Sequence, residues 1–229
     1  DFHGGEQHRI ALTALLQGDS KRNPATYLEA FQRATPEFLK SHPRVMKQVE
    51  SALIASKGTV TFVDLVARFN RRDLIGHLMD MARNDPEKEP GIRAVEQIIA
   101  FREWDPIWKA LADPNRSSPF IKALGFVNNE HSKNYLTGVV TNESQPEATR
   151  LLAIASMGQS SVPARELVKL VQQNRLPKEF LAPAVRALTL SPGPDTRMFA
   201  AGKVRTETSV RLVECCFLVE NVLSCSEDS

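Results

Sequence analysis

The residues whose types most often bind metal ions are scattered along this sequence. Histidine occurs at His3, His8, His42, His77 and His131. His3 and His8 are close enough to meet across a loop, but there is no His-Glu-x-x-His motif to place two ligands on one helix face. We therefore interpret both as solvated residues and expect no metal and no other cofactor.

Motifs for nucleophilic catalysis and nucleotide binding are also missing. The serine pairs 117–118 and 160–161 lack a nucleophile elbow, and no Gly-x-Gly-x-x-Gly or Walker-type loop occurs. Carboxylates are plentiful, but no pair has a context that would shift its pKa. Cys215, Cys216 and Cys225 all lie near the end, which excludes a disulfide framework. The adjacent pair would be redox-active if exposed, but in an apolar run we expect inert core residues, and we predict no enzyme.

Two tryptophans form the most suggestive spacing. Trp104 and Trp108 are four residues apart, with Arg102 and Lys109 alongside. Indoles flanked by cations can stack on a nucleobase, as in HEAT-like DNA glycosylases, and Asp105 or a neighbour would then be the catalytic carboxylate. Packing of both indoles between helical hairpins is commoner, and it is the interpretation that we prefer.

The charge balance argues against a nucleic-acid or membrane-surface partner. The chain has 29 basic and 27 acidic residues and a net charge of +2, which gives no strong field, so we expect no nucleic-acid partner. No run of about 18 apolar residues occurs, so we predict no transmembrane helix. The sequence begins at Asp1 without a leader, and we expect a mature product or a fragment whose compartment its start does not reveal.

Apolar residues recur at helical spacing through most of the chain. In 145–190, apolar faces follow Pro146, Pro163 and Pro177, and Gly158 fits a helix stop. Further helices are predicted within 7–16, 24–31, 35–39, 43–57, 59–69, 74–81, 92–101, 105–109, 120–124 and 135–140, with a turn over 113–119. Strand-like alternation is almost absent, which predicts an all-α protein.

We predict that these helices form a HEAT/armadillo-like α-solenoid of hairpins over residues 1–204. Arg93, Arg150 and Arg186 each follow a proline, at intervals of 57 and 36 residues (150 − 93 and 186 − 150), which indicates an irregular repeat. A weak break is expected at 84–90, and a non-repetitive bundle is the alternative. The tail over residues 205–229 fits either a helix or a strand by its periodicity. We favour a final capping helix, and a tail foreign to the rest of the protein is the second choice.

Six segments carry a family resemblance: 60–69, 85–86, 91–95, 121–125, 148–155 and 176–184. Together they resemble the HEAT-like domain of large multidomain proteins of planctomycetes and verrucomicrobia, over roughly residues 35–203. In that family the domain joins a dehydrogenase-like or other enzymatic domain to a c-type cytochrome domain, which implies a periplasmic or extracytoplasmic location. The Cys-x-x-Cys-His haem motif is missing from this chain, so we expect it to stop short of the haem domain.

The sequence therefore predicts a non-catalytic scaffold that presents a concave surface to a protein partner or to neighbouring domains of a larger protein. The candidate anchors are Arg93, Trp104, Trp108, Arg150 and Arg186, because Trp and Arg dominate interface energetics. For the three arginines, hydrogen bonding between helices is the stronger interpretation. The alternative function is nucleic-acid binding of the DNA glycosylase type, which requires the basic residues to gather on one face beside an exposed indole. A stand-alone enzyme would need a deep pocket between two helical domains, which no residue pattern predicts.

Overall fold

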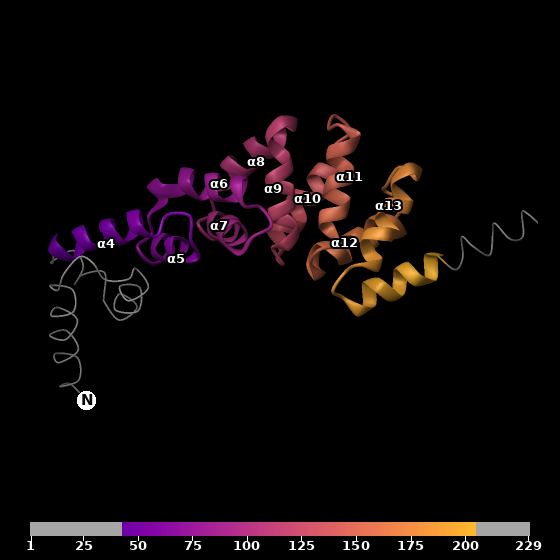
Figure 1. The fold of residues 1–229 in the computed structure, drawn as a ribbon. Coiled ribbons are helices and arrows are strands. Elements are labelled where there is room, and N and C mark those ends of the chain that lie inside the picture. The colour runs from indigo at the N-terminus through magenta and orange to yellow at the C-terminus, as the bar shows by residue number, and fades with distance from the viewer. Residues whose placement is uncertain (1–42, 205–229) are drawn as a thin grey trace, which may run out of the picture. The chain divides into compact units, whose positions relative to one another are not determined.

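The described part of the chain consists of helices and their connections. The computed structural model describes residues 43–204 (Figure 1), and no strand occurs in this range, which confirms the predicted all-α class. The helices are α4 (Pro43–Ala55), α5 (Val60–Arg68), the 3-10 helix η1 (Arg72–Leu74), α6 (Ile75–Asn84), α7 (Glu89–Ala100), α8 (Trp104–Ala112), α9 (Pro114–Phe126), α10 (Glu130–Thr141), α11 (Glu147–Met157), α12 (Ser161–Gln172) and α13 (Lys178–Thr189), and residues 194–204 are also helical. None of these described helices combines the length and the apolar character needed to cross a membrane.

Some predicted features lie outside the described residues. They are the helices within 7–16, 24–31 and 35–39, the tail 205–229, and the residues His3, His8, His42, Cys215, Cys216 and Cys225. The structure therefore bears on the predicted architecture only from residue 43 to residue 204.

Local signals set where α5 and α8 begin. The sequence leaves either Thr59 or Thr61 as the cap of α5. In the structure Thr59 is the cap, and its side chain accepts a hydrogen bond from the Phe62 N–H at 3.4 Å. Helix α8 begins at Trp104, just before the range 105–109 in which a helix is predicted, so the Asp105 carboxylate lies in the first turn and does not cap the helix. A carboxylate there still interacts favourably with the positive end of the helix dipole.

The turn predicted over 113–119 is wrong, because α9 begins inside it. Asp113 caps this helix by accepting a hydrogen bond from the Asn115 N–H at 3.0 Å, and Pro114 takes the first helical position. Proline is favoured there because its missing N–H would have no partner in the helix. Pro119 then lies within α9. The same Asp-Pro pair that favours a turn also favours a helix start.

Prolines do not mark equivalent positions in successive helices. Pro146 and Pro177 are the N-caps of α11 and α13, whereas Pro183 lies inside α13. Arg150 is consequently the fourth residue of α11, and Arg186 is the ninth residue of α13. The interval of 36 residues between these two arginines therefore does not measure a structural repeat.

Three helices end in the same left-handed turn. The turn residues Asn70, Arg102 and Asn174 have φ of 50°, 60° and 54°. In each case the next N–H bonds to a carbonyl five residues back: Arg71 to Val66 at 3.0 Å, Glu103 to Ile98 at 3.3 Å and Arg175 to Leu170 at 2.9 Å. This is the Schellman arrangement, which satisfies carbonyls that the helix leaves without partners.

The chain divides into two compact units. Unit 1 extends to Pro106 and unit 2 begins at Ile107, so the division falls in the first turn of α8. Within the polar linker 84–90, residues 85–88 form the turn between α6 and α7 inside unit 1, and the rest belongs to these two helices. This turn is tight, because a Cβ on Gly91 would lie 2.1 Å from the Asp85 carbonyl oxygen. In this unit α7 packs on both α5 and α6.

The helices of unit 2 pack in two rows. Helix α11 packs on α9 and on α13, while α10 packs on α12 (Figure 1). The helices α9, α11 and α13 begin 33 and 31 residues apart (147 − 114 and 178 − 147), and α10 and α12 begin 31 residues apart (161 − 130). This spacing is shorter than the period of roughly 40–47 residues that HEAT repeats have.

Two glycines allow the helices of the first row to approach closely. A Cβ on Gly125 of α9 would lie 2.8 Å from the Ser156 carbonyl oxygen, and a Cβ on Gly158 would lie 2.5 Å from that of Ala187 on α13. Gly158 follows α11, as predicted for a helix stop, but its φ is −71°. Glycine is required at this position by the close approach of α13 and not by the backbone conformation.

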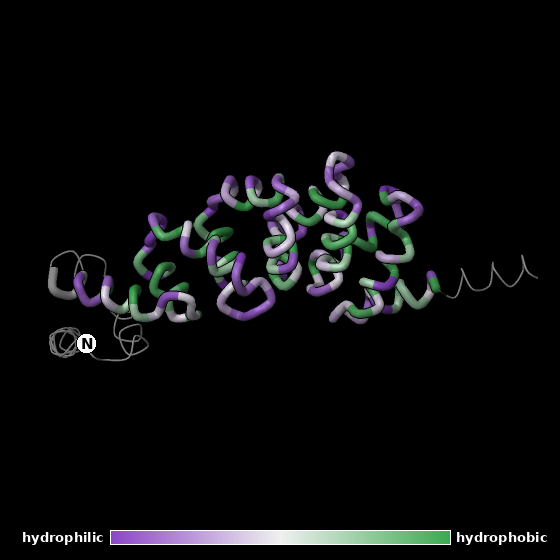
Figure 2. The backbone as a smooth tube through the Cα atoms, turned by 45° about the horizontal axis from the view of Figure 1, so that its top comes forward, coloured by the Kyte–Doolittle hydropathy of each residue, from purple (hydrophilic) through white to green (hydrophobic). Residues whose placement is uncertain are grey.

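Each helix has one apolar face. Figure 2 shows apolar and polar segments alternating along the helices, as expected when one face is buried and the other is solvated. Fully buried side chains of unit 2 include Leu111, Ile121, Leu124, Leu136, Ile154 and Phe180. Burial of these apolar faces stabilises the packing of the helices. It also positions the side chains that lie at the boundary between the buried and the solvated face of each helix.

Candidate functional site

Trp108 lies at the edge of the buried face of α8. Its neighbours Ile107 and Leu111 are buried, whereas Trp108 is 44% exposed. A residue beside the apolar stripe of an amphipathic helix sits at the boundary between protein and solvent. The indole is therefore anchored to the protein and still accessible to a partner.

Helix α10 forms a platform for this indole. The rings of Trp108 and Tyr135 are tilted by 54°, with their centroids 4.6 Å apart. Three residues further along α10, a Cβ on Gly138 would lie 3.0 Å from Cη2 of Trp108. Tyr135 is buried, so its ring is a fixed support, and Gly138 leaves room for the indole. Together they hold the ring in a preformed orientation.

A pocket of about 240 Å³ opens beside the indole within unit 2. It is formed by α8, α9, α10 and the loop after α10, through Trp108, Leu111, Ala112, Pro114, Gly138, Val139, Asn142, Ser144 and Gln145. None of these described lining residues is charged. The pocket is therefore an uncharged and mainly apolar recess, with amide and hydroxyl groups supplied by the loop.

The loop that closes this pocket is held by its own hydrogen bonds. The Ser144 N–H donates to Asn142 Oδ1 at 3.0 Å, and the Gln145 N–H donates to the Asn142 carbonyl at 3.0 Å. The side chain of Gln145 reaches α8, where Nε2 donates to the Leu111 carbonyl at 3.1 Å. Gln145 Oε1 is buried and accepts no hydrogen bond from the part of the chain that the structure describes. This oxygen is closed to solvent, so it is not presented to a molecule in the pocket.

Arg150 cross-links three helices of unit 2. Its Nε donates to the Val140 carbonyl of α10 at 2.9 Å, and its guanidinium lies 4.7 Å from the centroid of the Phe180 ring on α13. This arrangement matches the interpretation that an arginine hydrogen-bonds between helices. Arg186 differs, because it is exposed on α13.

The remaining predicted anchors lie in unit 1. Arg93 pairs with Asp64 of α5 at 3.4 Å and with Glu96 of α7 at 3.3 Å. Trp104 is partly buried at the start of α8, and Trp108 follows it on the other side of the division. Unit 1 therefore holds Arg93 and Trp104, and unit 2 holds the other three.

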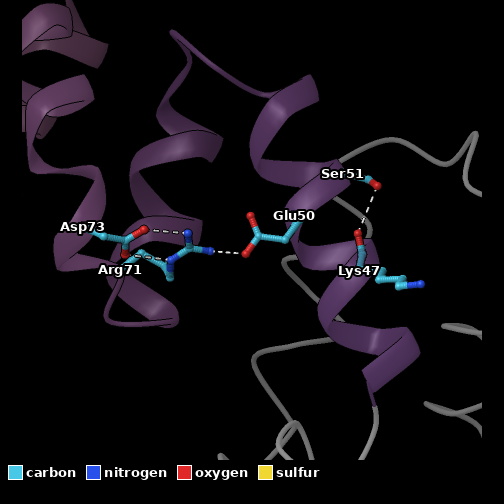
Figure 3. A network of polar contacts seen from close by, with 5 residues as sticks. All are labelled: Lys47, Glu50, Ser51, Arg71 and Asp73. Carbon is cyan, nitrogen blue, oxygen red and sulfur yellow. Dashed lines mark hydrogen bonds and ion pairs between the residues drawn. The ribbon is translucent and has the colours of Figure 1, made fainter.

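A polar network in unit 1 was not predicted from the sequence. Arg71 forms ion pairs with Glu50 of α4 and, at 2.7 Å, with Asp73 of η1 (Figure 3). In α4 the Ser51 hydroxyl donates to the Lys47 carbonyl at 3.0 Å. The hydrogen bond from Arg71 lowers the pKa of Asp73, and the same bond raises the pKa of Arg71. Both groups are held in their charged forms, so the network acts as a cross-link.

Basic and acidic side chains are interspersed in both units. Further ion pairs join Arg72 to Glu103, Arg83 to Asp80, Lys88 to Asp85, Arg116 to Asp113, Lys133 to Glu130, Arg165 to Asp195 and Lys169 to Glu166. Among residues 43–204, no three His, Cys, Asp or Glu side chains are grouped so that they could hold a metal ion. These ion pairs place acidic groups beside many of the basic side chains in both units.

The sequence predicted Trp108 as an anchor but missed the residues that build its pocket. Tyr135 was assigned only to a predicted helix within 135–140, and Gln145 only to the start of the helical stretch 145–190. Gly138 carried the one available signal, because an isolated glycine within a helical pattern often marks a close approach.

No family model, curated protein or solved structure matches this chain. The resemblance to the HEAT-like domain therefore stays a prediction.

Proposed function

We propose that this chain is a non-catalytic helical-repeat scaffold that binds another protein or a neighbouring domain, and that unit 2 carries a binding surface at Trp108. The half-exposed indole beside an uncharged pocket is the observation that carries the proposal. Tryptophan is enriched among the residues that dominate interface energy. An indole already held in place by Tyr135 and Gly138 loses little conformational freedom when a partner binds.

An α-solenoid is the arrangement that we infer for unit 2. The two rows of helices support it, and so do contacts between residues 30 to 34 positions apart: Gln145 with Leu111, Val162 with Asn128, Arg165 with Asp195 and Arg150 with Phe180. These separations are about one hairpin long, so each hairpin is linked to the next. Stacked repeats have this pattern and present extended surfaces to partners.

Nucleic-acid binding of the DNA glycosylase type is the second candidate. It is favoured by the exposure of Trp108 and by the exposed cations Lys109 and Arg102 near it in the sequence. The ion pairs argue against it, because a phosphate backbone is bound by a field of cations that are free to replace its counterions. We therefore rank it below protein binding.

Selection from a displayed library of random 12-residue peptides tests the proposed function. We expect Trp108→Ala to weaken the selected peptides by about tenfold or more, because truncated anchor tryptophans cost on the order of 2 kcal/mol. Leu190→Ala is the matched control, because Leu190 is 78% exposed and does not line the pocket. If Trp108→Ala leaves every affinity unchanged, this surface is not the binding site.

A single-stranded oligonucleotide, titrated across salt concentrations, tests the second candidate. Binding by cations would fall steeply with salt, because each phosphate contact releases a counterion. We expect weak binding that is not altered by Trp108→Ala. Tight, salt-sensitive binding that requires Trp108 would replace the protein-binding proposal.

A further inference from the structure

The first row of unit 2 repeats with a fixed packing register. Gly125, the twelfth residue of α9, closely approaches Ser156, the tenth residue of α11. Gly158 is at the twelfth position counted from the start of α11, and it approaches Ala187, the tenth residue of α13. In all three helices the seventh, eighth, tenth and eleventh residues are buried. The same positions therefore form the contacts at each step of the row.

The helix over residues 194–204 is the third member of the second row. The helices α10, α12 and this one begin at residues 130, 161 and 194, and Arg165 of α12 pairs with Asp195 at 3.0 Å. The eleventh residue of each helix is a valine. Val140 and Val171 are 0% and 5% exposed, whereas Val204 is 46% exposed. Val204 thus occupies a position that is buried in the two earlier helices of its row.

In the earlier hairpins this position lies against the first-row helix that follows. Helix α11 packs on α10, and α13 packs on α12. The Val140 carbonyl accepts a hydrogen bond from Arg150 of α11 at 2.9 Å, so the end of α10 meets α11. Lys203 departs from the apolar tenth residues of α10 and α12, but its aliphatic stem can pack while its charged end stays in water. A first-row helix after residue 204 would bury Val204 in the same way.

The spacing of the first row predicts where that helix begins. Successive first-row helices begin 33 and 31 residues apart, so the next one is due between residues 209 and 211 (178 + 31 and 178 + 33). With a start at Ser209, the four buried positions are all apolar: Cys215, Cys216, Leu218 and Val219. A start at 210 or 211 would instead bury the charged Glu220, which is unfavourable. The register therefore selects residue 209.

The connection to this segment also has the expected length. Residues 142–146 join α10 to α11, and residues 173–177 join α12 to α13. Between Val204 and Ser209 there are four residues, 205–208. So short a connection gives the segment a high effective concentration at Val204, which favours it over a second copy or another protein.

We propose that residues 209–221, which lie outside the described residues, form a fourth first-row helix that packs on α13 and covers Val204. This contact is separate from the surface at Trp108, so it goes beyond the proposed function. It places Cys215 and Cys216 inside unit 2. Phe217, at the ninth position, faces solvent, as Ala155 and Arg186 do in α11 and α13.

The three cysteines report this contact in the full chain without any substitution. Alkylation of each thiol is followed by mass spectrometry, first in buffer and then in concentrated urea. In buffer, we expect Cys215 and Cys216 to react at least about tenfold more slowly than Cys225, because a buried thiol reacts only when its helix opens. In urea the three rates should be similar. Equal rates in buffer would overturn the inference.

Two adjacent residues test which face of the segment is buried. Leu218→Asp would place a charge inside the unit, so Cys215 and Cys216 should then react as fast as Cys225. Phe217→Asp is the matched control, and it should leave both thiols protected because the ninth position faces solvent. If the two substitutions expose the cysteines equally, the register is wrong and the inference fails.

Val204→Asp tests the receiving surface, and Met198→Asp is its control. Met198 is 76% exposed at the fifth position of its helix, a position that is exposed in α10 and α12 as well. We expect Val204→Asp to expose the cysteines and Met198→Asp to leave them protected. Protection that Val204→Asp does not change would place the cysteines against another surface. Protection that is lost on dilution would identify a second copy as the partner, and either result would overturn the inference.

Discussion

The two units differ in how their helices are linked. In unit 1 the links run through exposed ion pairs, Arg71 with Glu50, Arg72 with Glu103 and Arg93 with Asp64. Among the described residues of unit 2, one link is of this kind, Arg165 with Asp195. Other bonds between its helices use uncharged acceptors: Gln145 to Leu111, Val162 to Asn128 and Arg150 to Val140.

The links in the two units are expected to respond differently to salt. Exposed ion pairs contribute roughly 0–1 kcal/mol each and are screened by salt. Bonds to backbone carbonyls and close helix contacts at Gly125 and Gly158 depend on geometry and much less on salt. The polar links of unit 2 are therefore expected to depend less on salt than those of unit 1, and the pocket beside Trp108 lies in unit 2.

Gly158→Ala is expected to destabilise unit 2 and to have the largest effect of the substitutions considered. The added Cβ would lie 2.5 Å from the Ala187 carbonyl oxygen, which is backbone and cannot rotate away. We expect a loss of about 3 kcal/mol in the stability of unit 2, comparable to overpacking a core. Hydrogen exchange, resolved by peptide, should show faster exchange in α11 and α13 than in α5 to α7.

Gly76→Ala is the control for this change. Gly76 lies in α6 with no heavy atom within 4 Å of a built Cβ. The substitution should stabilise unit 1 by about 0.5–1 kcal/mol, because alanine loses less backbone entropy in a helix than glycine. A Gly158→Ala variant as stable as Gly76→Ala would show that α11 and α13 are not in close contact.

Arg150→Met tests the links of unit 2 that use uncharged acceptors. It removes the donor to the Val140 carbonyl and the cation over the Phe180 ring. We expect a loss of about 2 kcal/mol in the free energy of unfolding, measured with urea. Arg186→Met is the matched control, since Arg186 is exposed and should change stability by less than about 0.5 kcal/mol. Equal effects of the two substitutions would contradict the role assigned to Arg150.

Arg150 and Arg186 show which features can be predicted from the sequence and which cannot. Helices were predictable because apolar periodicity is a local property, and the all-α class followed from it. Both Arg150 and Arg186 follow a proline, so local pattern treated them as equivalent. Their difference depends on where Phe180 and the α10 carbonyls lie, which is decided by packing between helices.

At the candidate site, too, contacts between different helices could not be predicted from local sequence patterns. The residue type of Trp108 and its position near Trp104 were enough to propose it as an anchor. Its partners Tyr135, Gly138 and Gln145 come from other elements, 27, 30 and 37 residues along the chain (135 − 108, 138 − 108 and 145 − 108). Periodicity identifies which face of a helix is buried but not which residues of another helix it meets, so the pocket could not be predicted.

Arg102→Gly is expected to stabilise unit 1. Arg102 adopts φ of 60° at the end of α7, a conformation in which a side chain is strained and glycine is not. We expect a gain of about 0.5–1 kcal/mol in the stability of unit 1, measured as a higher urea midpoint. Asn174→Gly, at φ of 54° in unit 2, should gain less, because asparagine tolerates this region. A loss of stability in Arg102→Gly would show that the arginine side chain makes a contact that outweighs the strain.

Asp73→Asn should have the smallest effect on stability. Its cost should depend on pH and on salt concentration, unlike the cost of a matched substitution in unit 2. Arg71 lowers the folded-state pKa of Asp73 below its ordinary value of 3.8, so the ionised carboxylate stabilises the folded state above about pH 4, and this contribution is lost as the pH falls through the folded pKa. At pH 7 and low salt, the substitution should cost about 0.5 kcal/mol, as expected for an exposed ion pair. The cost should shrink in 1 M NaCl and vanish near pH 2, measured by urea unfolding. Asn128→Ala, which removes the uncharged acceptor for the Val162 N–H in unit 2, should cost the same at low and high salt. If both costs respond to salt alike, the two units are not linked by different kinds of interaction.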